Sequence, residues 1–472
     1  TGAYNLFLTG NISAAIVNTS AVPLLALPML SGPFGFARAN AAVLKAMGTA
    51  NPFRGEKWET SAKYKKVADY LDLFAQRKHT FQKEILEGTR QSTQDFDNRS
   101  ARLMDLASRP FSLAEEYARA VTAIAAFDLA MQKRPPGKKY QNMTQEQAAL
   151  RYALDTVMNV NTSGMAAEGP SLMQHPIGRV MGTFKTFIWN SATVTALAMK
   201  QAGLLKPLGF AADPDAEIRA MARRQVIGIY GMSAALAGAN GLPFFGAATT
   251  LANMINAVVG DDDEPFNAKE EFRLFAGDLV YKGPLNYATN LEISNRIGLA
   301  NGLVFREDPY SVEQNGYVMT ALMQAMGPLG SYALGIERNA GRYLEKGEYG
   351  RFLEAMSPSA VRNILKTGRF IEEGARSVDG SPIDTDISTY NLFMQSLGFT
   401  PGDLSNTYEM RAAAKNFENK VLARKQRIMD KYFLGKHPDT FNPEVIREAQ
   451  QELMELIRDF PGIADTDTLE RS

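Results

Sequence analysis

The feature that most constrains the fold is a long stretch without charge. Residues 225–260 read QVIGIYGMSAALAGANGLPFFGAATTLANMINAVVG, in a chain of which 22% is Asp, Glu, Lys or Arg. The segment GANGLP at residues 238–243 interrupts any helix and leaves two arms of about 15 and 17 residues, roughly 22 and 25 Å long. Neither arm comfortably crosses a hydrocarbon core of about 30 Å. The stretch therefore predicts two helices that fold back on each other as an antiparallel hairpin with an apolar tip.

The charges that flank this stretch support the same prediction. Arg223 and Arg224 precede it and residues 261–263 are all Asp, so an antiparallel hairpin brings opposite charges together at its base. Two uses of the hairpin stay open: a buried pair of core helices, or a surface that contacts lipid or another subunit. The candidate contact residues are Gly231, Gly238, Gly241, Pro243, Phe244 and Phe245.

A second uncharged stretch lies at the N-terminus, where Arg38 is the first charged residue. A signal peptide opens with a basic region and continues into one apolar region, whereas this stretch has no basic start and contains Pro23, Pro28 and Pro33. Because proline interrupts helices, we expect no continuous membrane-spanning helix here. Packing in a core or against another subunit is the expected use.

Helix signals dominate the rest of the chain. Sustained alternation of apolar and polar residues, the pattern of a half-buried strand, is not found. We therefore expect an all-α fold, an elongated multi-helix assembly with helical hairpins and no substantial sheet. The expected helix starts carry a capping box or a capping side chain before proline, at Ser112–Glu115, Thr144–Gln147, Asn267–Glu270, Asp213-Pro214, Ser357-Pro358 and Asn442-Pro443.

Composition breaks divide the chain into five predicted regions. The first two are an N-terminal helical region with the proline-broken segment (1–134) and a second helical region (135–205). The apolar hairpin region (206–300) and a further helical region (301–385), which ends in the polar turn SVDGSPIDTD, come next. The last region (386–472) predicts a charged antiparallel hairpin with helices near residues 406–433 and 443–460.

The sequence carries few signs of catalytic chemistry. It has no cysteine, and its histidines, His79, His175 and His437, lack metal-ligand spacing. Walker, GxSxG and GxGxxG motifs do not occur. The formal net charge of zero argues against a dedicated nucleic-acid-binding domain. We expect no catalytic residue, cofactor or metal in this segment, while the activity of a longer parent chain stays open.

Three passages together resemble a known group of proteins. Residues 175–190, HPIGRVMGTFKTFIWN, are similar to the PLxRFG signature of very large bacteriophage polyvalent proteins, with departures at Ile177 and at Val180-Met181. The matching positions are Pro176, Gly178, Arg179, Phe184 and Lys185. Residues 10–20 resemble the segment that precedes this signature, and residues 283–374 resemble the region that follows it, in the same order along the chain.

The resemblance implies the C-terminal part of a podophage internal virion protein, or ejection protein. Such a segment is expected to lie inside the capsid at the portal or tail channel, and to help form a conduit for DNA across the host envelope after ejection. The implied partners are portal or tail proteins, other ejection proteins, further copies of the chain, passing phage DNA and the host membrane.

Two other readings of the chain stay open. One is the C-terminal packaging and anchoring domain of a giant virion-associated RNA polymerase, which the same resemblance includes. The other is an ordinary soluble helical enzyme domain with an unrecognised site.

Overall fold

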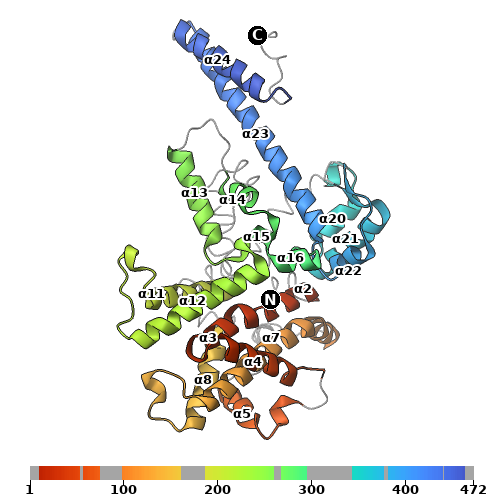
Figure 1. Cartoon of the computed structure of the whole chain (residues 1–472). Coiled ribbons are helices and arrows are strands. Elements are labelled where there is room, and N and C mark those ends of the chain that lie inside the picture. Colours follow the sequence, from red (N-terminus) through yellow and green to blue (C-terminus); the bar gives the residue numbers. More distant parts are fainter. Residues whose placement is uncertain are drawn as a thin grey trace.

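The computed structural model describes residues 10–53, 57–74, 98–160, 186–259, 267–294, 343–376, 381–438 and 441–462. These residues form an all-α fold, as predicted (Figure 1). Strand structure within them is limited to β1 (Ala375–Arg376) and β2 (Pro382–Asp384), which pair antiparallel. Part of the predicted polar turn at 377–386 is therefore a very short strand.

The N-terminal body is built around one central helix, α7 (Asn98–Gln132). Between residues 118 and 130 this helix is buried on nearly all sides, in a segment that is rich in alanine and that also buries the polar residues Arg119, Thr122 and Asp128. It packs against α2, α4 and α8. The other elements of the body are α2 (Ile12–Thr19), η1 (Val22–Ala26), α3 (Leu27–Phe34), α4 (Phe36–Thr49), η2 (Trp58–Thr60), α5 (Lys65–Leu73), η3 (Lys138–Tyr140) and α8 (Gln145–Val160).

The N-terminal prolines do not interrupt the helical path, contrary to the prediction. The chain is helical from Ile12 to Phe34. Pro23 and Pro28 stand within the first two positions of η1 and α3, where a missing N–H costs little, and Pro33 lies inside α3 near its end. By length and composition this run is the one candidate membrane span among the described residues. Half of it is buried, with Leu24, Leu25 and neighbours inside the core, so the predicted core packing is confirmed for these residues.

The middle of the chain lies on this body (Figure 1). Its longest helix, α12 (Ala216–Ala237), packs against α3 on one side and against α11 (Thr186–Ala202) on the other. The remaining elements are η4 (Lys206–Leu208), η5 (Ala239–Gly241), α13 (Phe245–Val259), α14 (Ala268–Ala276), α15 (Asp278–Lys282) and α16 (Pro284–Thr289).

The predicted antiparallel hairpin of residues 225–260 is wrong. Phe244 has a positive φ of 66°, and at this turn the chain directs α13 away from α12 and toward η5 and α14 (Figure 1). Helix α12 also begins well before the uncharged stretch. Residues 261–263, which were expected to meet Arg223 and Arg224, lie outside the described residues.

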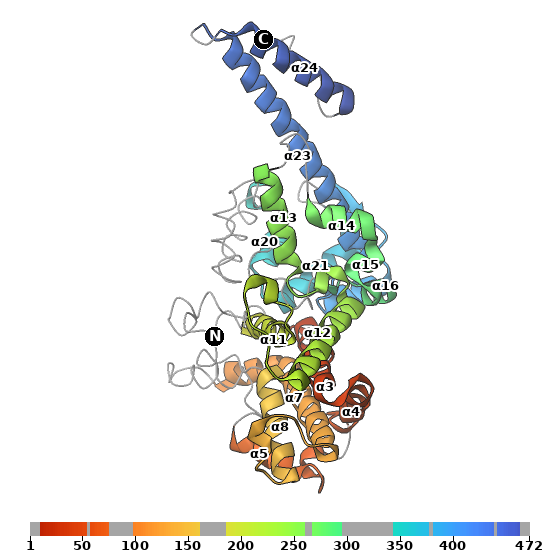
Figure 2. The ribbon, with the colours of Figure 1, turned by 60° about the vertical axis from the view of Figure 1, so that its left-hand side comes forward.

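The C-terminal part forms a small helical unit and a projecting hairpin. The unit contains α20 (Tyr349–Met356), α21 (Ser359–Glu373), the two strands and α22 (Thr389–Ser396). Helix α23 (Gly402–Lys436) extends beyond the other described helices in both views, and α24 (Pro443–Asp459) folds back along its far half (Figure 2). The predicted hairpin is thus confirmed, with its own core of Val421, Ile428, Met429, Ala449, Leu453 and Leu456.

The capping predictions were partly right. Thr144 and Gln147 form the reciprocal capping box, with N–H donors 3.1 and 3.3 Å from the side-chain oxygens. Asn267 and Asn442 also cap their helices as predicted. The other three were wrong: Ser112 lies inside α7, Asp215 rather than Asp213 caps α12, and Pro358 precedes α21 with no capping side chain at Ser357.

Candidate functional site

The turn between α12 and α13 is where the sequence placed an exposed apolar tip, and the structure buries it. Gly238, Gly241 and Pro243 are all buried within the chain. A β-carbon on Gly238 would lie 2.4 Å from the backbone nitrogen of Gly283, and one on Gly283 would lie 2.4 Å from the nitrogen of Gly238. Two backbones therefore cross here at a distance that only glycine permits, and these residues pack the interior in this conformation.

The two phenylalanines of the turn are half-buried. The Phe245 ring packs edge-on against Phe272 and Tyr281, with ring centroids 5.2 and 6.3 Å apart. Burial raises the pKa of the Tyr281 phenol to about 12, which fits a ring enclosed by this aromatic cluster. Phe245 thus joins α13 to α14 and α15, while Phe244 supplies the turn itself.

Gly231 is the exposed member of the predicted contact set. It borders an apolar cavity of about 370 Å³ between α3, α4 and α12, together with Phe36, Ile227 and Met232. The cavity floor includes Gly228, where a β-carbon would come within 3.1 Å of Pro28. Small residues on α12 thus allow α3 to approach closely, and the cavity remains open beside that contact.

The five matching positions of the PLxRFG-like motif lie outside the described residues. They are Pro176, Gly178, Arg179, Phe184 and Lys185.

A buried network of charges joins the base of α23 to α15 and α16. The side chains of Lys282 and Glu292 are each 7% exposed and pair at 3.2 Å. Lys282 Nζ also lies 2.6 Å from a carboxylate oxygen of Glu409 on α23, and Arg273 on α14 pairs with the same carboxylate at 3.0 Å. A second carboxylate, Asp278, pairs with Arg273 as well.

Neutral side chains complete this network. Glu292 Oε1 accepts hydrogen bonds from Ser294 Oγ at 2.6 Å and from Asn286 Nδ2 at 3.2 Å. Lys282 Nζ donates to Asn406 Oδ1 at 2.7 Å. A buried charge is tolerated only when it is paired and its remaining hydrogen-bonding positions are filled, and both conditions hold here. The arrangement therefore fixes helix positions and offers no unpaired acid or base for catalysis.

The sequence does not indicate this network. Its members come from four separate segments, with Lys282 and Glu292 in the middle region and Asn406 and Glu409 in the C-terminal hairpin. The passage that contains Glu292 was singled out only through resemblance. Lys282 and Glu409 lie far apart in the sequence, so their pairing produces no recognisable sequence pattern around either residue.

The described residues contain no group of three or more His, Asp or Glu that could hold a metal ion. No protein-family model, curated protein or solved structure matches the chain.

Proposed function

We propose that this chain is a segment of a bacteriophage internal virion protein that docks at the portal or tail channel and helps to form a conduit for genome delivery. The ordered resemblance of three passages supports this proposal. It includes portal or tail proteins and other ejection proteins as partners, further copies of the chain, phage DNA in passage and contact with the host membrane. The chain would occupy the capsid interior first and the host envelope after ejection.

The structural observation that carries the proposal is that the projecting hairpin and the small helical unit have cores of their own, apart from the core that the N-terminal body shares with α12. The largest cluster draws on residues between 22 and 157, whereas the projecting hairpin has its own cluster of α23 and α24 residues. A further small cluster joins Phe370, Ala375 and Leu404. The hairpin core joins two consecutive helices, and helical units with such local contacts refold quickly and open independently. A part built in this way suits passage through a narrow channel.

The test is to follow the chain through infection. Peptides of this segment are expected in purified phage particles, absent from particles that have released their DNA, and present in the envelope fraction of infected cells. Absence of the chain from intact particles would overturn the proposal. A polymerase activity that copurifies with the chain would instead favour the alternative in which this segment anchors a packaged RNA polymerase.

A further inference from the structure

The connection between α11 and α12 exposes apolar side chains at the edge of the molecule. We define the α11–α12 tip as residues 203–215, which include η4. Figure 1 shows it on the left-hand side of the body, where the two packed helices end. Leu204, Leu208 and Phe210 are 50%, 72% and 51% exposed. These side chains are large, and water contact with them is unfavourable.

The tip is an ordered turn that holds these side chains outward. The N–H of Leu208 donates to the carbonyl of Leu205 at 3.1 Å, and the N–H of Phe210 donates to the same carbonyl at 3.3 Å. Gly209, with φ at +84°, provides the left-handed turn between them, and its N–H bonds the carbonyl of Lys206 at 2.9 Å. Exposure of the apolar residues is therefore fixed by the backbone.

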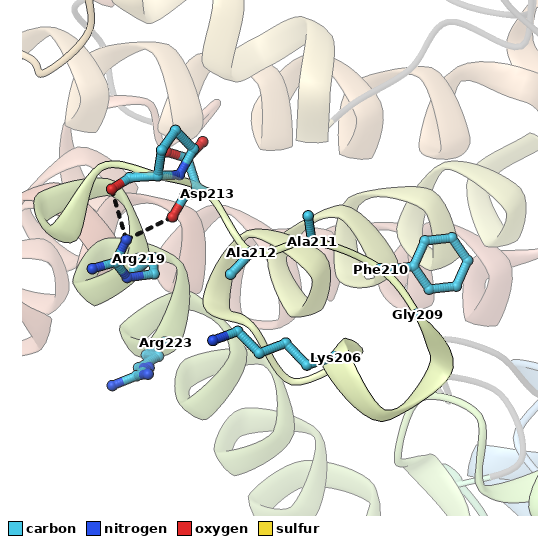
Figure 3. A pocket seen from close by; sticks show the side chains of 9 residues that line it. Lys206, Gly209, Phe210, Ala211, Ala212, Asp213, Arg219 and Arg223 are labelled. Atoms are coloured by element: carbon cyan, nitrogen blue, oxygen red, sulfur yellow. Dashed lines mark hydrogen bonds between the residues drawn. The ribbon is translucent and has the colours of Figure 1, made fainter.

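Basic side chains surround the same turn. Lys206, Arg219 and Arg223 line an open cavity of about 800 Å³ that Phe210 also borders (Figure 3). Arg219 Nη1 donates to the carbonyl oxygens of Asp213 and Pro214, at 2.7 and 2.8 Å. Arg223 Nε donates to the carbonyl oxygen of Ala202 at 3.3 Å. Main-chain carbonyls thus orient both guanidinium groups without neutralising their charge.

The side chains that line the cavity carry a net positive charge, because three of them are basic and one, Asp213, is acidic. Within the described ranges, none of the three basic side chains forms an ion pair with a carboxylate, in contrast to Lys282 and Arg273 at the base of α23. The acidic groups at the tip serve the backbone: Asp213 Oδ1 accepts from the N–H of Asp215 at 2.9 Å, and Asp215 Oδ1 accepts from the N–H of Glu217 at 2.7 Å. Asp213 is the single carboxylate among the cavity's lining residues.

We propose that the α11–α12 tip docks on an anionic phospholipid surface, with a lipid phosphate in the basic cavity and the three exposed apolar side chains at the boundary between headgroups and acyl chains. Apolar burial and attraction to anionic lipids act together in such interfacial contacts. This inference specifies the membrane contact that is part of the proposed function, and it rests on that function for its biological role. Binding of the chain to lipid can be measured whether or not the proposed function is correct.

The exposed leucines decide between lipid and nucleic acid. A DNA backbone offers phosphates to Lys206, Arg219 and Arg223, but its grooves and phosphates give Leu204 and Leu208 no apolar partner. A membrane surface accommodates both kinds of side chain. We therefore commit to the lipid phosphate and treat DNA as a competing outcome of the test.

The experiment is sedimentation of the purified chain with vesicles of phosphatidylcholine alone, or of phosphatidylcholine and phosphatidylglycerol in equal amounts. We expect binding to the anionic vesicles only, and weaker binding at high salt. Each basic residue near an anionic surface contributes about 1 kcal/mol, so Lys206→Gln with Arg223→Gln is expected to lower binding roughly thirtyfold. Arg219 stays unchanged because it supports the turn.

Two further variants separate the apolar contribution from general charge effects. Leu208→Ser with Phe210→Ser keeps every charge and is expected to reduce binding roughly a hundredfold, because burial of each side chain contributes about a factor of ten. Lys133→Gln with Lys138→Gln removes the same charge from exposed positions at the end of α7 and in η3, and is expected to leave binding unchanged. Circular dichroism of each variant checks that the fold is retained.

Three results would overturn the proposal. These are no binding of the wild type to anionic vesicles, equal binding to neutral vesicles, or equal loss in the Lys133 and Lys138 control. Binding of a duplex oligonucleotide that is lost in the Lys206 and Arg223 variant, without vesicle binding, would assign the cavity to DNA phosphates instead. Binding of inorganic phosphate that is lost in the Lys206 and Arg223 variant, without vesicle binding, would assign the cavity to the free ion instead. Failure of vesicle binding leaves the presence of the chain in phage particles untouched, so the two proposals fail separately.

Discussion

The turns at the two ends of α12 have similar compositions but differ in burial. Both turns are rich in glycine, proline and apolar residues, yet the turn at η5 is buried and the α11–α12 tip is exposed. At the buried end, the nearby charges of Lys282 and Glu292 pair with each other. At the exposed end, Lys206 and Arg223 have no carboxylate partner among the described residues. In these two turns, the pairing of the surrounding charges therefore distinguishes the buried turn from the exposed one better than apolar content does.

The largest expected difference between the two ends is in the loss of unfolding free energy when a glycine in each turn is replaced by alanine. Gly238 has φ +61° and ψ −159°, a region that only glycine adopts readily, and a β-carbon would collide with the backbone of residues 280–283. Gly238→Ala should cost more than about 4 kcal/mol of unfolding free energy or prevent folding. Gly209→Ala, at φ +84° with no atom within 4 Å of the new carbon, should cost only about 1 to 2 kcal/mol.

Urea denaturation of both glycine variants measures this difference. Similar losses of stability at the two positions would show that the two backbones do not cross at Gly238 and Gly283.

Removal of a lysine at each end is the second comparison. Lys282→Met leaves Glu292 buried without its cation, so we expect a loss of about 3 to 5 kcal/mol in unfolding free energy. The double variant Lys282→Met with Glu292→Met should recover part of that loss, because no unpaired charge remains between them. Lys206→Met at the tip should change stability by no more than about 0.5 kcal/mol. A stable Lys282→Met protein would contradict the buried network.

The smallest expected difference is in acid sensitivity. Lowering the pH should destabilise α14 and α15, near the buried end of α12, before it affects the α11–α12 tip. The hydrogen bond from Arg273 lowers the pKa of Asp278 below its ordinary value of 3.8, with burial acting in the opposite direction. A carboxylate with a lowered folded-state pKa contributes stability above its unfolded pKa, and this contribution is lost as the pH falls through the lowered value. Hydrogen exchange of α14 and α15 should therefore accelerate relative to the tip below about pH 4, after correction for intrinsic rates.

The variant Asp278→Asn tests this assignment. It should remove the acid-dependent step from α14 and α15 and leave the remainder of the exchange profile unchanged. A step of the same size in the variant would assign it to another group.

Local chemistry could be predicted from the sequence, but long-range geometry could not. Asn442 and the Thr144–Gln147 pair cap helices as expected, because each bond joins residues within one turn. Ser112 has the same pattern as Thr144 but lies inside α7, since packing of the apolar run that follows it favours one continuous helix. The prediction that α13 folds back on α12 failed because Phe244 adopts a positive φ. A positive φ is rare for phenylalanine, so the sequence does not indicate this turn.

The α11–α12 tip was visible in the sequence but was interpreted only as a break. Leu204, Leu208 and Phe210 stand among glycine, proline and lysine residues there, and the structure exposes all three side chains. Whether such residues fold inward depends on contacts with distant segments. Composition alone therefore indicated the η5 turn as the candidate contact surface, and the structure buries Gly238, Gly241 and Pro243 of that turn within the chain.

The network of charges at the base of α23 also has a mechanical consequence. With 35 residues, the helix is about 52 Å long, and a tilt of about 10° at its base displaces its far end by about 9 Å. Lys282 and Arg273 pair with Glu409 near the N-terminal end of this helix, about which such a tilt would occur. A small change in those two ion pairs would therefore displace the distal hairpin much more than it displaces Glu409, so the position of the hairpin depends on the geometry of this junction.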